Sequence, residues 1–145
     1  MTRLAAICIT LLSLTGPPVS AQETDMTDAI FLDGKTAELS QFKWTHRPLA
    51  VFADSPADPA FIRQMDLLNA DLPALLDRDV VVLVDTDPDA KSDIRRTLRP
   101  RGFGIVLIGK DGGIKLRKPV PWTVRELSHT IDKMPMRQQE LSERR

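Results

Sequence analysis

The segment best placed to do chemistry is Asp54, Ser55, Pro56, Ala57 and Asp58, which directly follows an apolar run and carries two carboxylates and a hydroxyl. A serine hydrolase would surround Ser55 with a Gly-x-Ser-x-Gly pattern and place a histidine beside it, and that pattern is absent. Asp58 instead has the position of a helix N-cap, and Ser55 suits a turn. We therefore assign no catalytic residue to this segment.

A second candidate group is basic. Residues 22–94 hold fifteen acidic and six basic residues, whereas residues 95–118 hold eight basic residues and one acidic residue, Asp111. These cations either pair with the acids of the first half or form a surface that binds an acidic protein, an anionic glycan or a lipid head group. Nucleic acid is not expected, because basic and aromatic residues do not alternate. The candidate binding residues are Arg95, Arg96, Arg99, Arg101, Lys110 and Lys115.

The sequence offers few residues that could hold a metal ion or a cofactor. The acidic run 85–89 begins like a calcium loop, but Ala90 stands where that loop needs glycine and Arg96 where it needs a bidentate glutamate. The chain has two histidines, His46 and His129, and no third ligand accompanies them. We expect no metal site and no cofactor.

The N-terminus has the pattern of a cleaved signal peptide. A positive start, an apolar run over residues 4–14 and the small-residue ending Val19-Ser20-Ala21 predict removal of residues 1–21. The run is too short for a transmembrane anchor, so we expect export to a periplasm or the extracellular space. Cleavage removes Cys8, the single cysteine. Since disulfide exchange and peroxide reduction need a thiolate, a thiol oxidoreductase or peroxidase is excluded.

The elements that position these groups follow from periodicity. Residues 22–30 are predicted to be a flexible leader, followed by a leading hairpin around Asp33-Gly34. The apolar runs 49–53 and 80–84 predict buried strands. The apolar stripe from Phe61 to Leu72 predicts the helix between them, which Pro73 interrupts. A strand, helix and strand of these lengths form a right-handed βαβ unit.

The second half predicts a short helix, a hairpin and a closing helix. Ser92 suits the cap of a helix that ends at Leu98, and residues 103–108 form the next strand. The turn Asp111-Gly112-Gly113 then begins an alternating edge strand over 114–117. A helix follows Thr123, and the polar residues 137–145 are expected to fray. Together these elements predict an α/β thioredoxin-like sandwich with a central mixed sheet, an antiparallel hairpin and a C-terminal helix.

Three segments carry a family resemblance: Phe42-Lys43-Trp44 with residues 47–53, the hairpin residues 108–117, and residues 134–140, Met-Pro-Met-Arg-Gln-Gln-Glu. They resemble the family called domain of unknown function 4174 (DUF4174) over about residues 39–141. The resemblance implies a peroxiredoxin-like fold in exported bacterial proteins and supplies no established activity. With the N-terminal pattern and the order of the elements, we expect a signal peptide over 1–21, a flexible leader over 22–30, a thioredoxin-like DUF4174-type domain over 31–141 and a tail over 142–145.

In that fold a reactive cysteine would lie between the first central strand and its helix, where Asp54–Asp58 stands without a thiol. A cis-proline would face it, and Pro100 is the candidate; a peroxiredoxin-type arginine would match Arg99 or Arg101. Two hypotheses follow. One is a non-catalytic binding or structural domain that uses the basic residues, and the other is a non-thiol enzyme that uses carboxylates or His46 at the carboxyl ends of the strands.

Overall fold

The computed structural model describes Thr27 and residues 29–145. The expected signal peptide and most of the expected leader lie outside these residues. Ile30, at the end of the expected leader, is fully buried. Within the described residues no helix has the length and apolar character needed to cross a bilayer.

The elements follow one another in an α/β order. They are β1 (Phe31–Asp33), η1 (Leu39–Phe42), β2 (Arg47–Phe52), α2 (Pro59–Asn69), α3 (Leu72–Leu76), β3 (Val80–Asp85), η2 (Pro88–Ala90), α4 (Asp93–Leu98), β4 (Gly104–Ile108), β5 (Ile114–Lys118), α5 (Val124–Asp132) and α6 (Pro135–Glu143).

The five strands form one mixed sheet in the order β1-β3-β2-β4-β5. Strands β1, β3 and β2 are parallel, and β4 and β5 add to them as an antiparallel hairpin. The predicted βαβ unit, hairpin and α/β sandwich are confirmed. The predicted leading hairpin is wrong, because Phe31 lies opposite Val82 in a parallel pair. The chain between β1 and β2 carries η1 and crosses over, so it cannot make a tight turn.

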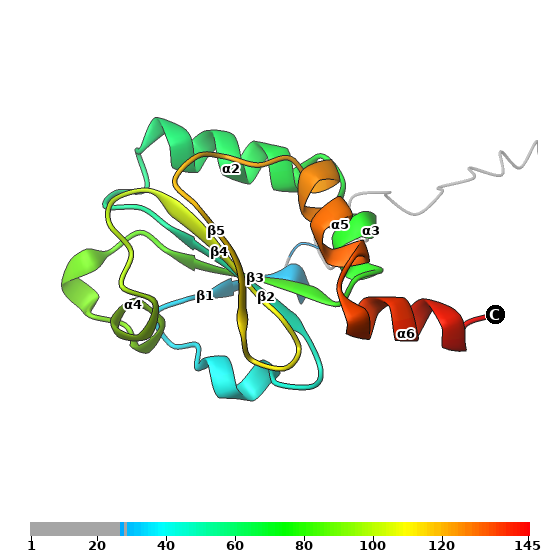
Figure 1. The fold of residues 1–145 in the computed structure, drawn as a ribbon. Coiled ribbons are helices and arrows are strands. Elements are labelled where there is room, and N and C mark those ends of the chain that lie inside the picture. The colour runs from blue at the N-terminus through cyan, green and yellow to red at the C-terminus, as the bar shows by residue number, and fades with distance from the viewer. Residues whose placement is uncertain (1–26, 28) are drawn as a thin grey trace, which may run out of the picture.

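Alternation along the strands fills both faces of the sheet (Figure 1). In β3, Val80 and Val82 belong to one core cluster, whereas Val81 and Leu83 belong to the other. Helices α2, α3 and α5 cover the first cluster, and α4 and η1 cover the second. Successive side chains of a strand point to opposite faces, so continuous apolar runs are what a sheet covered on both sides requires.

The C-terminal helix α6 is held by ion pairs. Arg47 at the start of β2 is 1% exposed, and its Nη2 lies 2.9 Å from Glu140 Oε1. Arg137 is also 1% exposed, and its Nη2 lies 2.5 Å from Asp77 Oδ2. The predicted fraying of residues 137–145 is therefore wrong, because α6 runs to Glu143 and buries an arginine against the domain.

Glu140 is the carboxylate shared by the most buried part of this network. It accepts hydrogen bonds from Arg47, and Lys110 Nζ lies 2.8 Å from its Oε1. Burial would raise the pKa of Glu140, but Arg47 and Lys110 outweigh it and lower the pKa to about 2. Glu140 therefore stays ionised and ties α6 to β2 and to the β4–β5 hairpin.

Candidate functional site

The segment Asp54–Asp58 lies between β2 and α2, as predicted, and its side chains serve the local backbone. Asp58 Oδ1 accepts hydrogen bonds from the Ala60 N–H at 2.8 Å and the Phe61 N–H at 3.4 Å, which caps α2. Ser55 Oγ accepts a hydrogen bond from the Ala57 N–H at 3.1 Å. The junction therefore has the geometry of a helix cap and a turn.

Asp85, at the carboxyl end of β3, is a buried carboxylate in a dense set of hydrogen bonds. Arg95 Nη2 donates to Asp85 Oδ1 at 3.0 Å and to the Ala53 carbonyl at 3.1 Å, and Ser92 Oγ donates to Asp85 Oδ2. Burial would raise the pKa of Asp85, but the hydrogen bonds from Arg95 and Ser92 outweigh it and lower the pKa. Asp85 is therefore ionised and, through Arg95, links the carboxyl ends of β3 and β2.

Arg95 is consequently part of the interior. Its side chain is 12% exposed and lies over the Phe52 ring, with the guanidinium carbon 5.3 Å from the ring centroid. For Arg95 the structure supports the alternative in which the basic residues pair with acids of the first half.

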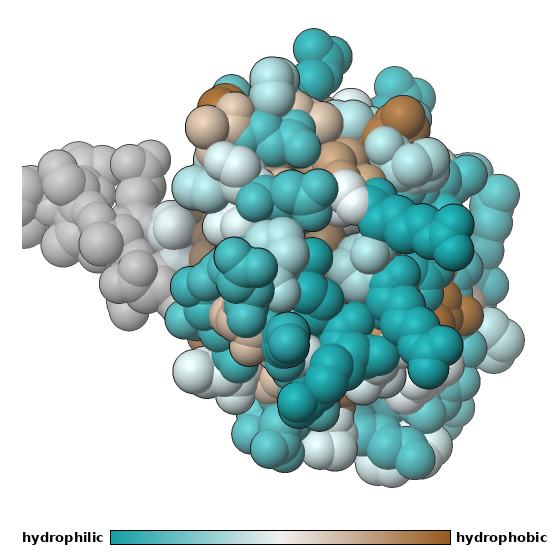
Figure 2. Space-filling view, turned by 90° about the vertical axis from the view of Figure 1, so that its left-hand side faces the viewer, coloured by the Kyte–Doolittle hydropathy of each residue, from teal (hydrophilic) through white to brown (hydrophobic). Residues whose placement is uncertain are grey.

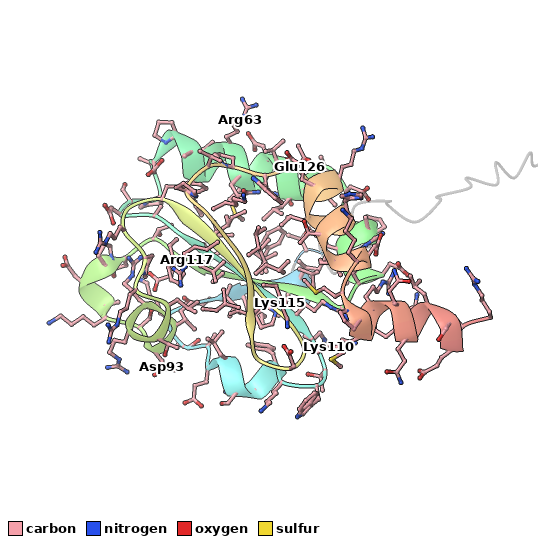
Figure 3. The ribbon with its side chains drawn as sticks, in the orientation of Figure 1. Arg63, Asp93, Lys110, Lys115, Arg117 and Glu126 are labelled. Carbon is pink, nitrogen blue, oxygen red and sulfur yellow. The ribbon has the colours of Figure 1, made fainter. Side chains whose placement is uncertain are left out.

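Lys110 and Lys115 lie at the hairpin turn (Figure 3). Lys110 is 11% exposed and its Nζ lies 2.7 Å from Asp79 Oδ2, in addition to its contact with Glu140. Lys115 Nζ lies 2.8 Å from Asp111 Oδ2. The six residues predicted to form one surface are therefore divided among a buried brace, the hairpin turn and a third location.

That third location is a pocket of about 850 Å³ between the end of α4, the loop before β4 and the end of β5. Arg96, Arg99 and Arg101 line it, and Figure 3 shows Arg117 on the side of β5 toward α4. We call this the basic pocket, and its five cationic residues are Arg96, Arg99, Arg101, Arg117 and Lys118.

Apolar residues of the core lie beneath the basic pocket. Val106 and Ile105 of β4 contribute to its lining, as do Phe52 of β2, Leu98 of α4 and the loop residue Phe103. Figure 2 views the side of the molecule that carries α4 and shows strongly hydrophilic side chains gathered beside patches of apolar surface. Phe52, Leu98, Ile105 and Val106 are at most 3% exposed, so they offer a ligand almost no surface, whereas Phe103 is half-buried.

Local backbone geometry positions the cations of this pocket. Arg99 follows α4 in the left-handed conformation, with φ 50°, and its N–H bonds the Arg95 carbonyl at 2.9 Å. A non-glycine residue in that region costs on the order of 1 kcal/mol. Gly102, with φ 63°, turns the loop into β4. The peptide bonds of the described residues are trans, so Pro100 does not occupy the cis-proline position.

The charges of the pocket are only partly compensated. Arg117 Nη1 donates to the Leu98 carbonyl at 2.8 Å, and Lys118 Nζ lies 4.8 Å from the Trp122 ring centroid. Arg96 pairs with Asp93 at 3.5 Å on the surface. Carboxylates are absent among the residues that line this pocket, and the side chains of Arg99 and Arg101 form no ion pair or hydrogen bond with other described residues.

The structure does not bring together the groups of the alternative enzyme hypothesis. His46 directly precedes β2, whereas Asp54 and Asp85 lie at the opposite, carboxyl ends of β2 and β3. His129 lies on α5 and is exposed. Among the described residues, no group of three or more His, Cys, Asp or Glu side chains is arranged to hold a metal ion.

Sequence reasoning missed the grouping of Arg117 with the α4 arginines. The strand register supplies that grouping, because Val106 pairs with Arg117 and both residues face the α4 layer. The alternation of residues 114–117 contained this signal, but only the pairing of β4 with β5 shows which charged residue lies beside α4.

Comparisons with known proteins agree with this architecture. The family described as Domain of unknown function (DUF4174) matches residues 38–140. The reduced 2-Cys peroxiredoxin of Plasmodium vivax superposes with a TM-score of 0.57 at 15% identity, covering 71% of this chain and 85% of that chain. The mitochondrial 2-Cys peroxiredoxin of Plasmodium falciparum gives 0.48 at 17% identity, covering 66% and 79%. The likeness to the P. vivax structure shows a shared thioredoxin-like fold.

Proposed function

Because this chain belongs to the DUF4174 family and has a thioredoxin-like fold, we propose that it is an exported, non-catalytic binding domain that holds an anionic ligand in the basic pocket. The observation that carries the proposal is the composition of that pocket, where five cationic residues and no carboxylate line a cavity of about 850 Å³. Small-molecule sites are concave, mostly apolar and supplied with a few polar groups that fix orientation.

The state of the carboxylates supports the absence of catalysis. Asp58 caps a helix and Asp85 is fixed by Arg95, so neither is free to exchange a proton with a substrate. General acid–base catalysis needs a group whose pKa is near the working pH, and the pKa of Asp85 is lowered away from that range. The single cysteine, Cys8, lies outside the β2–α2 junction, so a redox pair is absent from the chain.

Arg99 and Arg101 are the cations most available to a ligand. A hydrogen bond to a charged group contributes about 1.5–3 kcal/mol, and an arginine fork can bind a carboxylate or phosphate through two such bonds. The compatible partners are an acidic protein segment, an anionic glycan or an anionic head group. Export is supported by the charged start, apolar run and small-residue ending of residues 1–21.

The test is a calorimetric titration with anions of different chemistry: citrate, inorganic phosphate, octanoate and a heparin oligosaccharide. We expect at least one of them to bind the wild-type protein and the double variant Arg99→Glu/Arg101→Glu to bind it at least tenfold more weakly. The matched control Arg63→Glu/Arg125→Glu makes the same change in charge on the exposed surface of α2 and α5 and should bind like the wild type. Binding by none of the anions, or equal binding by both variants, would overturn the proposal.

A further inference from the structure

A smaller cavity lies at the other end of the β4–β5 hairpin from the basic pocket, between the start of β2, the hairpin turn and the start of α6. Its volume is about 110 Å³. The segments 47–53, 108–117 and 134–140, which are far apart in the sequence, contribute its whole lining. We call it the small cavity, and its lining residues are Arg47, Gly109, Lys110, Asp111, Lys115, Met134, Pro135 and Met136.

The charge that faces the small cavity is positive. Lys110 and Lys115 come from the hairpin turn beside the start of α6 (Figure 3), and Arg47 joins them from β2. Arg47 is 1% exposed, so its guanidinium is held inside the domain. Asp111 is the single carboxylate of the lining, and it already accepts hydrogen bonds from Lys115 Nζ and the Gly113 N–H. Three cations therefore face one carboxylate.

The two most buried of these cations keep hydrogen-bond donors that no described residue fills. Arg47 donates to the Arg78 carbonyl at 2.8 Å and to the two oxygens of Glu140 at 3.3 and 2.9 Å, which occupies three of the five N–H groups of a guanidinium. Lys110 Nζ contacts Asp79 and Glu140, which occupies two of its three N–H groups. Buried donors of this kind are satisfied by water or by a ligand.

Helix α6 begins beside the small cavity without a side-chain cap. Its N-cap residue Met134 makes no side-chain cap hydrogen bond, and Pro135 has no N–H to offer. The first N–H groups of a helix have no partner within the helix and favour an anion. The thioethers of Met134 and Met136 are weak acceptors, so they satisfy neither these groups nor the cations. A metal ion would be repelled by the three cations.

From these contacts we propose that the small cavity binds a tetrahedral inorganic oxyanion, phosphate or sulfate, through the remaining donors of Arg47, Lys110 and Lys115 beside the uncapped start of α6. A water molecule occupies about 30 Å³ of the liquid, so a cavity of about 110 Å³ holds one such ion and excludes a glycan or a peptide. The proposal goes beyond the proposed function, because it concerns another end of the hairpin and other residues. The ion would link β2, the hairpin and α6.

The test is an NMR titration of the isotope-labelled full chain with sodium phosphate and with sodium sulfate, with sodium chloride at equal ionic strength as the reference. We expect saturable amide shifts at residues 109–115 and 136–137 with both oxyanions and none with chloride. Phenyl phosphate, whose ring exceeds the cavity, should bind at least tenfold more weakly than phosphate.

Two matched variants assign the binding to the small cavity. Lys115→Gln removes a cation at a side chain that is 35% exposed, and it should weaken both oxyanions at least tenfold. Lys91→Gln removes the same charge from an exposed residue after η2, at the carboxyl end of the parallel strands, and should bind like the wild type. Thermal melting of both variants shows that they are folded.

The outcomes separate this proposal from the proposed function. Arg99→Glu/Arg101→Glu should keep the shifts at residues 109–115, and their loss would assign the oxyanion to the basic pocket and contradict the small cavity. Equal binding of phenyl phosphate and phosphate would contradict a free inorganic ion in favour of the phosphoryl end of a larger molecule. Equal affinity in Lys115→Gln and Lys91→Gln, shifts that chloride reproduces, or no saturable shift at residues 109–115 would overturn the proposal, and the last of these would mean that the cavity holds water.

Discussion

Glu140→Gln is expected to weaken the fold by loosening α6 from the rest of the domain. In the wild type, Arg47 Nη2 lies 2.9 Å from Glu140 Oε1, and Lys110 Nζ lies 2.8 Å from the same oxygen. Glutamine keeps the shape but removes the charge. The change leaves Arg47, which is 1% exposed, without its anionic partner, and removing one partner of a buried ion pair is strongly destabilising.

The magnitude follows from the pKa of Glu140. The side chain is 20% exposed, and its pKa is lowered from 4.5 to about 2. At about 1.4 kcal/mol per pKa unit, the ionised form contributes about 3 kcal/mol to the free energy of unfolding. Because the folded pKa lies below the unfolded value, this contribution is complete above about pH 4.5. It is lost as the pH falls through about 2.

Urea denaturation followed by tryptophan fluorescence measures this difference. At pH 7 the variant should lose about 3 kcal/mol relative to the wild type, and the gap between them should narrow as the pH falls from 4.5 toward 2. Glu143→Gln is the matched control, since Glu143 is exposed on the same helix and should change stability by less than about 0.5 kcal/mol. A loss below about 0.5 kcal/mol for Glu140→Gln at pH 7 would refute the assignment of Glu140 as the anchor of α6.

Three further outcomes are expected. Arg95→Ala should lower the free energy of unfolding by about 3 kcal/mol or more in urea denaturation, because it leaves the buried Asp85 unpaired. The control Arg96→Ala, at the exposed neighbouring position, should change the free energy of unfolding by less than about 0.5 kcal/mol. Similar losses in the two variants would contradict the pairing of Arg95 with Asp85. Mass spectrometry of the exported protein should give a mature chain that begins at Gln22, and an intact N-terminus would exclude cleavage. Insulin reduction and peroxide consumption with a dithiol should stay at background, and measurable turnover would contradict the absence of thiol chemistry.

Local sequence signals predicted most of the fold because the interactions behind them are local. Asp58 and Ser92 each accept a hydrogen bond from a backbone N–H at the start of their helices, where the caps were expected, and Thr123 caps the helix that was expected to follow it. The apolar runs became buried strands, and Gly112 took the positive φ that the hairpin turn needs. These features depend on residues within a few positions of each other.

The missed features depend on contacts between distant residues. Arg47 and Glu140 are separated by 93 residues, and nothing near either one marks it as buried. The polar segment after Met134 lacks an apolar period, so its order comes from ion pairs rather than from a hydrophobic face. The pairing of β1 with β3 was missed for the same reason, because strand order depends on tertiary packing.

The basic residues show the same limit at the candidate site. Arg95 and Arg96 are neighbours in α4, yet one is braced against Asp85 and the other lines the pocket. Both residues are arginines, so the sequence does not distinguish them. Only the position of α4 against the end of β3 decides which cation is buried and which faces a ligand.

The most direct test of the basic pocket is an NMR titration of the isotope-labelled protein with octanoate, with backbone amide shifts followed at each residue. Binding in the pocket predicts saturable shifts confined to residues 96–106 and 117–119, which disappear in Arg99→Glu/Arg101→Glu. Shifts centred on Lys110 and Lys115 at the hairpin turn, or no saturable shifts, would contradict the pocket as the binding site.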